Sequence, residues 1–247
     1  MTMSSPVALV IGAGDATGGA IARRFAREGY TACVTRRSLD ALQPLLDQIH
    51  ADGNQARGFG SDARKEEEVI ALVEQIESEV GPIEVLVFNI GANVPCSILE
   101  ETARKYFKIW EMACLGGFLN GREVARRMVA REGDGRRRTI IFTGATASLR
   151  GAAHFAAFAG AKHALRALAQ SMARELGPRG IHVAHVVIDG AIDTAFIRDN
   201  FPERYALKDQ DGILNPDHIA DSYWMLHSQP RDAWTHELDL RPYLEKF

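Results

Sequence analysis

The fold of this 247-residue sequence is restricted most by a regular alternation of short apolar runs with longer stretches of helical period. The apolar runs predict buried strands at 7–12, 31–35, 55–62, 83–89, 138–144 and 180–189. The stretches between and after them predict helices at 18–28, 39–53, 64–81, 102–131 and 154–176. A helix starting at Asn215 or Pro216 and a last strand at 234–240 end the pattern.

Strand–helix alternation of this kind predicts an α/β fold. Its parallel strands would be joined by right-handed crossovers into a doubly wound sheet with helices on both faces. The nearly continuous Val, Ile and Leu runs agree, because both faces of such a sheet are covered. Residues 1–247 are expected to form one domain, since no linker or internal repeat interrupts the pattern. Ligands of such sheets bind at the carboxyl ends of the strands, so the loops that follow strands are the expected site.

The first of these loops is the glycine-rich segment GAGDATGGA at 12–20. A phosphate needs free backbone N–H groups at a helix N-terminus and small residues that let the backbone come close. The spacing fits G-x-x-x-[GA]-x-G and not G-x-G-x-x-G, and it follows a buried strand directly. It therefore predicts dinucleotide binding rather than only a tight turn. The residues expected around the phosphates are Gly12, Gly14, Asp15, Ala16, Thr17 and Gly18.

Two arginines, Arg36 and Arg37, follow the second predicted strand. Sheets of this kind place an acid there for the ribose 2′-hydroxyl of NAD, or an arginine for the 2′-phosphate of NADP. A guanidinium binds a phosphate through paired N–H bonds. The sequence therefore favours NADP(H) over NAD(H), with Asp15 a counter-indication because its carboxylate would repel a nearby phosphate.

Composition excludes several classes of partner. The 29 Lys and Arg against 32 Asp and Glu leave no cationic surplus for nucleic acid or an anionic membrane. Three cysteines without paired spacing indicate neither a disulfide framework nor a metal site. No apolar run is long enough to span a membrane, and the N-terminus lacks the pattern of a signal peptide. We therefore expect a cytoplasmic protein with a small-molecule substrate.

Motifs after the later strands carry a family resemblance. The glycine loop matches T-G-x-x-x-[GA]-x-G with Ile11 in place of the threonine. FNIG at 88–91 matches N-N-A-G, and DGAIDT at 189–194 matches P-G-x-[VI]-x-T with Asp189 in place of the proline. With these motifs in this order, the chain resembles the short-chain dehydrogenase/reductase family over essentially its full length. The resemblance implies a Rossmann-type sheet and a nicotinamide dinucleotide cofactor.

The resemblance also implies cofactor contacts for individual residues. Asp62 takes the position that contacts adenine, Ile192 the position that meets the nicotinamide amide, and Thr194 the position at the pyrophosphate. Lys162 takes the position that holds the ribose. The other family positions retained in these motifs are Asn89, Gly91 and Gly190.

The family's catalytic residues are where the sequence departs. Relatives use a serine, then Tyr-x-x-x-Lys, and an asparagine on an earlier helix, with the tyrosine hydroxyl donating a proton to the substrate carbonyl. Lys162 is kept, but Phe158 stands at the tyrosine position, Ala145 at the serine and Cys114 at the asparagine. Phenylalanine has no group that could donate a proton.

Three neighbours are candidates to replace the missing acid: Thr146, His154 and Lys162. Each also has an ordinary explanation: a threonine bonded to local backbone, a histidine at a helix start, and a lysine that holds ribose. Two interpretations remain open. The chain is an NADP(H)-dependent oxidoreductase with an unusual acid, or it binds the nucleotide without turnover as a redox-responsive or structural partner.

Further expectations concern the substrate and assembly. Phe155, Phe158 and Phe196 would favour a small apolar carbonyl, alcohol or enone, and by the resemblance 193–214 would cover it. The helices at 102–131 and 154–176 correspond to those through which relatives form dimers or tetramers, and Gly116-Gly117 would permit close contact. The arginine run at 136–138 is expected in a solvated loop, with an anion site as the alternative.

Overall fold

The computed structural model of the chain describes residues 5–91 and 93–246. Its centre is a seven-stranded parallel sheet in the order β3-β2-β1-β4-β5-β6-β7. The strands are β1 (Val7–Ile11), β2 (Thr31–Arg36), β3 (Ala56–Gly60), β4 (Ile83–Phe88), β5 (Thr139–Thr143), β6 (His182–Ile188) and β7 (Glu237–Leu240). The doubly wound α/β fold predicted from the sequence is confirmed.

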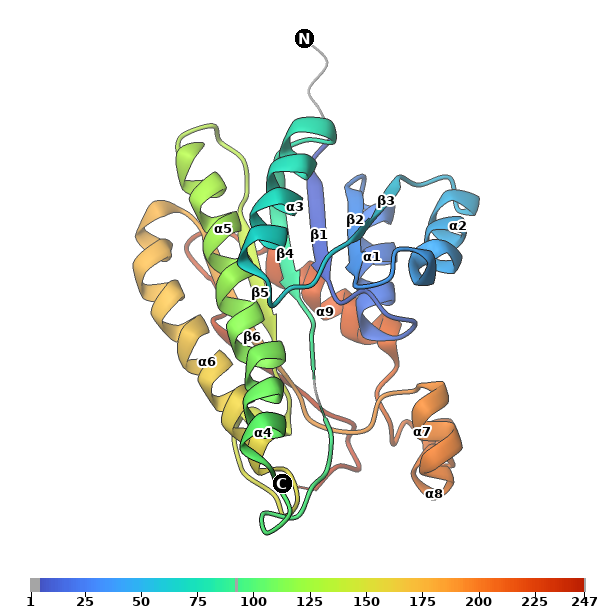
Figure 1. Cartoon of the computed structure of the whole chain (residues 1–247). Coiled ribbons are helices and arrows are strands. Elements are labelled where there is room, and N and C mark those ends of the chain that lie inside the picture. The colour runs from blue at the N-terminus through green and yellow to red at the C-terminus, as the bar shows by residue number, and fades with distance from the viewer. Residues whose placement is uncertain (1–4, 92, 247) are drawn as a thin grey trace.

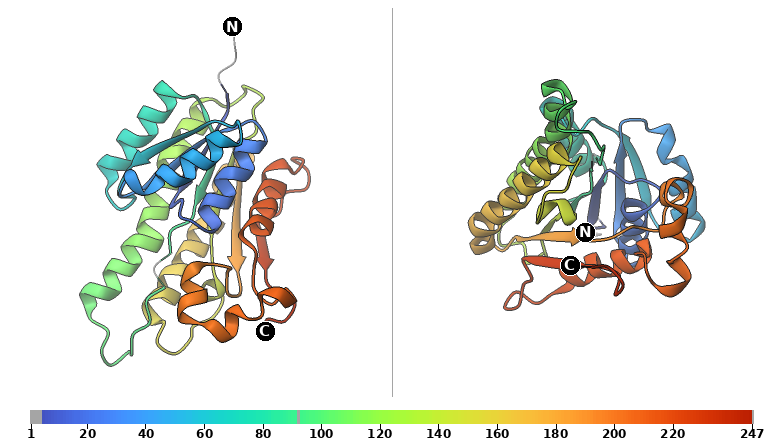
Figure 2. Two further views of the ribbon diagram at one scale, coloured as in Figure 1. Left: turned by 90° about the vertical axis from the view of Figure 1, so that its right-hand side faces the viewer. Right: turned by 90° about the horizontal axis from the view of Figure 1, so that it is seen from below.

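Helices cover both faces of the sheet (Figure 1). Those of the first half and the end of the chain are α1 (Thr17–Arg27), α2 (Gln43–Ala51), α3 (Glu66–Glu79) and α9 (Pro216–Ser228). The long central ones are α4 (Ala103–Trp110), α5 (Gly116–Ala130) and α6 (Ala156–Leu176). Two short helices, α7 (Ala195–Asn200) and α8 (Pro202–Tyr205), lie beyond the carboxyl end of the strands (Figure 2).

Two apolar cores follow from the alternation of side chains along the strands. Ala8 and Val10 of β1 face α1, α2 and α9, whereas Leu9 and Ile11 face α3, α5 and α6. β1 pairs with β2 on one side and with β4 on the other. The strands β2 and β3 are therefore added on one side of β1 and those from β4 onward on the other side, so the order of addition reverses between β1 and β4. This switch point is where doubly wound sheets bind ligands.

The helix predicted at 102–131 is divided. A π-helical turn at Glu111–Leu115 separates α4 from α5 and contains Cys114. Such turns insert an extra residue and often mark functional positions. Gly117 of α5 is buried, and a Cβ there would lie 2.5 Å from Leu165 of α6. The glycine therefore serves close packing inside the chain rather than a surface for a second copy.

The expectation of a solvated loop at 136–138 is wrong for Arg138 and in part for Arg136, whereas Arg137 is exposed as expected. Arg138 is 4% exposed, and Arg136 lies 2.6 Å from the carboxylate of Glu84. Arg137 donates hydrogen bonds to the carbonyls of His227, Ser228 and Gln229 at the end of α9. The loop is ordered because a helix C-terminus and a buried carboxylate at the amino end of the sheet need cationic partners.

Candidate functional site

A cleft of about 290 Å³ lies at the carboxyl end of β1, β2 and β4. Its walls are the loops that follow β1, β2, β3 and β4, with one side chain from the π-helical turn. The lining residues are Ile11, Gly12, Gly14, Thr35, Arg36, Arg37, Ser61, Asp62, Ala63, Arg64, Ile90, Gly91 and Met112. The cleft brings together segments that the sequence analysis selected separately.

The glycine loop forms one wall of this cleft. Gly12 adopts φ +84°, which favours glycine, and the N–H groups of Gly12 and Ala13 donate to Thr35 O of β2 at 3.2 Å. A Cβ on Gly18 would lie 2.5 Å from Gly12 O. A Cβ on Gly14 would meet nothing within 4 Å. The loop therefore packs tightly against its own fold while its Gly14 side opens into the cleft.

The end of β2 places two arginines at the cleft. Arg36 is half-buried and donates to the carbonyl of Ala41 at 3.1 Å, and its Nη1 lies 3.6 Å from the carboxylate of Asp15. Arg37 is exposed and makes no ion pair among the described residues. Both arginines thus line the cleft where the sequence predicted them, with Asp15 beside one of them.

Asp62 lies at the same cleft but is already paired. Arg64 donates to both of its carboxylate oxygens, at 2.9 Å from Nε and 2.5 Å from Nη2. The hydrogen bonds from Arg64 lower the pKa of Asp62 to about 2, so it is ionised at neutral pH. Sequence reasoning missed Arg64, although its position two residues after Asp62 was the available signal.

The loop after β4 lines the cleft next to the glycine loop. Asn89 donates from Nδ2 to Gly12 O at 3.2 Å, so it ties this loop to the glycine loop. A Cβ on Gly91 would come no closer than 4.0 Å to any atom, and that atom belongs to Phe158. Asn89 thus acts inside the fold, while Gly91 leaves room beside the Phe158 ring.

Lys162 is buried beneath this junction, with 2% of the residue exposed. Its ammonium donates to Ile90 O at 3.0 Å and to Thr143 O at 2.8 Å, which links the ends of β4 and β5. Burial lowers the pKa of Lys162 to about 8. Two of its three donors are occupied by the protein.

The Phe158 ring lies close to this amine, with its centroid 5.9 Å from Lys162 Nζ. Phe158, Ala147 and Ala157 belong to one small apolar cluster with Ala145 at its border. The buried Cys114 lies near enough to Lys162 to interact with its charge, and burial raises the pKa of the thiol. The structure therefore brings the three substituted positions together around Lys162.

The hydroxyl of Thr146 is used within the protein. It donates to Oδ1 of Asp189 at 2.5 Å. Asp189 is 3% exposed, and its other oxygen lies 3.1 Å from Arg241, which follows β7. Asp189 thus gains partners that the proline of the family motif could not bind, and no sequence pattern indicated the Arg241 contact.

His154 lies in a turn directly before helix α6. It is exposed, has φ +70°, and precedes helix α6 by two residues, with Phe155 as the N-cap. Its carbonyl accepts a hydrogen bond from the Cys96 N–H at 2.8 Å. The histidine therefore lies at the start of the helix, in an exposed turn just before α6 begins, rather than inside the helix itself.

The loop after β6 leads into the predicted cover. Gly190 has φ +153°, and a Cβ there would lie 2.7 Å from Pro242. The ends of the cover at 193–214 are joined by a parallel bridge between Ile192 and Leu214. Thr194 caps α7 by accepting from the Ile197 N–H at 3.1 Å. The segment is therefore a flap that is anchored at its base.

Phe196 on this flap is 62% exposed and contacts Phe201 of the same segment, with ring centroids 6.0 Å apart. It does not join Phe155 and Phe158 in a closed apolar wall in this structure. Tyr205 lies over Lys208, which pairs with Asp193 at the base of the flap at 2.8 Å.

The residues of the cleft fit a nicotinamide dinucleotide. The open side of Gly14 is a cradle that a side chain would fill, and it faces the arginines after β2. Gly91 leaves a second opening beside Phe158. No group of metal-ligating side chains occurs among residues 5–91 and 93–246.

Comparison with known proteins agrees with this geometry. The model of the short chain dehydrogenase family matches residues 6–204. The chain belongs to the short chain dehydrogenase family. It is 31% identical over 209 residues to the short-chain reductase protein NovJ of Streptomyces niveus, covering 85% of this chain and 77% of that protein. Sorbitol-6-phosphate 2-dehydrogenase of Escherichia coli is 27% identical over 219 residues, covering 88% of this chain and 82% of that protein.

Solved structures place the chain in the same family. A short-chain dehydrogenase from Rhodopseudomonas palustris is 46% identical with a TM-score of 0.79, covering 97% of this chain and 99% of the other. A metagenomic short-chain oxidoreductase in complex with NADP is 25% identical with a TM-score of 0.81, covering 99% of this chain and all 100% of the other. The chain is thus an oxidoreductase of the short-chain dehydrogenase type with the Rossmann-type fold. Among the described residues no helix has both the length and the apolar character needed to cross a membrane.

Proposed function

We propose that the protein is an NADP(H)-dependent oxidoreductase in which no tyrosine supplies the proton. The observation that carries the proposal is the Gly14 cradle facing Arg36 and Arg37 across one cleft, with buried Lys162 at the junction of β4 and β5. Two guanidinium groups beside a glycine-walled phosphate site suit a 2′-phosphate. The related metagenomic oxidoreductase that was solved with NADP supports this preference.

The roles that follow for cofactor binding are these. The N–H groups of the glycine loop at 12–18 would bind the pyrophosphate, and Arg36 and Arg37 the 2′-phosphate. Asp62 would contact adenine only through the carboxylate lone pairs that accept no hydrogen bond from Arg64. The remaining contacts fall to Asn89, Gly91, Lys162, Gly190, Ile192 and Thr194.

A bound nicotinamide supplies hydride, so the protein must supply or accept the accompanying proton. Phe158 offers no donor, and neither does Ala145. Lys162 has one N–H beyond the two that bind Ile90 O and Thr143 O, and its pKa of about 8 lies near neutrality. We assign the proton donor to Lys162, whose one remaining N–H would hold the ribose until it is given to the substrate.

The other two candidates are less suited. The proton of Thr146 is directed at Asp189, so the hydroxyl would have to give up that bond before donating to a substrate. His154 lies in an exposed turn outside helix α6. Thr146 would therefore act mainly as an acceptor for a substrate hydroxyl, and His154 would not take part.

The substrate we propose is a small apolar carbonyl, alcohol or enone, with the flap at 193–214 as its cover and the cytoplasm as the place of reaction. The apolar cluster around Phe158 supports an apolar substrate. The alternative, a catalytically silent nucleotide-binding protein, is not favoured, because the relatives are named as dehydrogenases and reductases.

The test is to measure NADPH and NADH affinity by fluorescence and then to follow NADPH oxidation over a panel of ketones, quinones and enones. We expect NADPH to bind more tightly and at least one substrate class to be reduced. The rate should fall by at least about 100-fold in Lys162→Met, with smaller changes in Thr146→Val and His154→Ala. Tight binding without oxidation of any substrate would establish the silent alternative.

A gain-of-function variant examines the same pocket. Phe158→Tyr with Ala145→Ser restores the two hydroxyls of the family pattern beside Lys162. We expect a new or faster ketone reduction, since the ring of residue 158 already lies over the amine. The single Phe158→Tyr variant is the control for the contribution of the serine.

We also propose that the protein forms a homodimer or homotetramer through α4, α5 and α6. Exposed aromatic side chains on these helices support this, with Phe107 56% and Phe118 38% exposed. Light scattering should give a multiple of the 27.1 kDa chain mass, and Phe107→Glu should shift it toward the monomer. A monomer mass for the unchanged protein would refute the assembly.

A further inference from the structure

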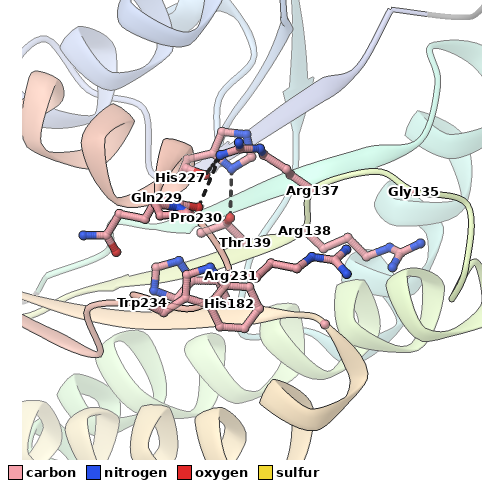
Figure 3. A pocket seen from close by; sticks show the side chains of 11 residues that line it. Gly135, Arg137, Arg138, Thr139, His182, His227, Gln229, Pro230, Arg231 and Trp234 are labelled. Atoms are coloured by element: carbon pink, nitrogen blue, oxygen red, sulfur yellow. Dashed lines mark hydrogen bonds between the residues drawn. The ribbon is translucent and has the colours of Figure 1, made fainter.

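A second cavity lies at the opposite end of the sheet from the glycine loop. It has a volume of about 340 Å³ and is formed at the starts of β5 and β6 and by the loop between α9 and β7 (Figure 3). An adjoining cavity of about 490 Å³ shares Gly135, Arg138, Gly180, Arg231 and Trp234 with it. These two volumes form one recess, which we call the amino-end recess.

The charged side chains that line this recess are mostly positive. Its first cavity is lined by Arg137, Arg138 and Arg231 and by no acidic side chain. In the adjoining cavity the single acidic side chain, Glu132, is paired with Arg179 at 2.8 Å. A wall of this kind attracts anions, because Arg137 and Arg231 have no paired carboxylate among the described residues and leave a positive charge there.

The three arginines differ in what they already bind. Arg137 is used by the fold, since it donates to carbonyls at the end of α9. Arg138 pairs with Asp134 at 2.5 Å, but its Nε is buried without a hydrogen-bond partner. Arg231 is exposed and makes no ion pair within 5–91 and 93–246. Two guanidinium groups in one recess therefore retain unused donors.

A flat aromatic wall stands beside these donors. The rings of His182 and Trp234 stack with centroids 4.9 Å apart and 3° between their planes. Burial lowers the pKa of His182, and its Nε2 lies 2.8 Å from Thr235 O, so the ring is neutral and holds its proton on Nε2. The stack thus adds an apolar surface and no charge.

We propose that the amino-end recess binds an aromatic carboxylate. Its carboxylate would lie against the guanidinium of Arg231, near the positive charge of Arg138, and its ring against Trp234. A planar guanidinium pairs with a carboxylate through two parallel N–H bonds, which a neutral amide cannot accept in the same way. The site is separate from the cofactor cleft, so it does not depend on the function proposed above.

The probe is benzoate, with benzamide as the uncharged molecule of the same shape. The indole N–H signal of Trp234 in a proton–nitrogen NMR spectrum reports on the recess, assigned with Trp234→Phe. We expect benzoate to shift this signal saturably, with a dissociation constant of about 1 mM for so small a ligand. Benzamide should leave it nearly unchanged.

Arg231→Gln removes the charge at an exposed position where the fold is not at risk. It should weaken benzoate binding by about tenfold and leave NADPH affinity unchanged. The matched control is Arg174→Gln on α6, whose side chain donates to Gln170 O and makes no ion pair in the described part of the chain. Equal shifts from benzoate and benzamide, benzoate affinity unchanged in Arg231→Gln, or no saturable shift would each overturn the proposal.

Discussion

The two ends of the same sheet differ in how far their polar groups are bonded within the protein. At the carboxyl end, the Gly14 side of the loop after β1 faces open space, and Arg37 after β2 makes no ion pair among the described residues. At the amino end, polar side chains are bonded to one another in the interior. His227 lies 2.7 Å from the Tyr30 hydroxyl and 2.8 Å from that of Thr139, and Tyr30 reaches Glu84 at 3.3 Å.

The difference shows how one fold separates stability from function. Parallel strands point their carboxyl ends to one edge, where the loops can leave backbone groups for a ligand. The opposite edge lies away from the cofactor cleft, and the buried side chains of Tyr30, Thr139 and His227 there are partnered with one another. Changes in the cofactor cleft should therefore act on cofactor binding, and changes in the buried network around His227 on stability.

Gly14→Val should have the largest effect. The side chain would point into open space, so the fold loses little, but it would occupy the volume of the phosphates. We expect NADPH affinity to fall by more than about 1,000-fold, with the free energy of unfolding changed by less than about 1 kcal/mol. Binding is measured by NADPH fluorescence and stability by urea unfolding.

Gly151→Val is the matched control, because a Cβ at this exposed glycine also meets nothing within 4 Å and it lies outside the cleft. It should leave NADPH binding intact. If Gly14→Val binds NADPH normally, the glycine loop is not the phosphate site and the comparison of the two ends fails.

The second effect is a pH dependence of stability at the amino end. Burial lowers the pKa of His227 to about 4 in the folded protein, against about 6.5 in an unfolded chain. Between these values the unfolded chain holds a proton that the folded one lacks, so stability falls as the pH drops from 6.5 to 4. His227 should account for about 2 kcal/mol of loss between pH 7 and pH 5.

Urea unfolding at both pH values measures this loss. His227→Gln should reduce the loss by that amount, whereas His218→Gln, an exposed position on the same helix, should not. His185 contributes in the same direction, because burial lowers its pKa to about 4 as well. An unchanged pH dependence in His227→Gln would show that the buried network is not held in its neutral form.

Sequence patterns predicted the alternating elements well because strand burial and helical period are local signals. They also located the glycine loop, Arg36 and Arg37, whose chemistry follows from position after a strand, whereas Lys162 was assigned through the family motif. They could not show that Arg241 binds Asp189, because residues 52 positions apart meet only through the packing of β6 on β7. They misjudged Arg138, since a loop rich in charge gave no sign that this side chain would be buried with the Arg131 carbonyl and Asp134 as its partners.

The third effect concerns the choice of cofactor. Arg36→Ala with Arg37→Ala removes both guanidinium groups from the cleft. We expect NADPH affinity to fall by about 30-fold and NADH affinity to change by less than about twofold, because only NADPH carries the 2′-phosphate. Arg27→Ala with Arg174→Ala removes the same charge from two helices outside the cleft and should affect neither cofactor.

Equal losses for both cofactors in the Arg36 and Arg37 variant would assign these side chains to the fold or to a part of the cofactor that NADH shares. The same comparison at raised salt gives a second measure. An exposed ion pair with phosphate is screened, so the preference for NADPH should shrink as the ionic strength rises.

The smallest expected effect comes from Asp15, which lies 3.6 Å from Arg36 in the same cleft and is almost fully exposed. Its carboxylate competes with a phosphate for the arginine and repels it, although solvent weakens both interactions. Asp15→Asn should therefore tighten NADPH binding by about two- to threefold and leave NADH unchanged. Adding Asp15→Asn to the Arg36 and Arg37 double variant should raise NADPH affinity by less than it does in the unchanged protein, because Asp15 and the phosphate no longer compete for Arg36. An equal gain in both backgrounds would mean that Asp15 acts on the phosphate directly and not through Arg36.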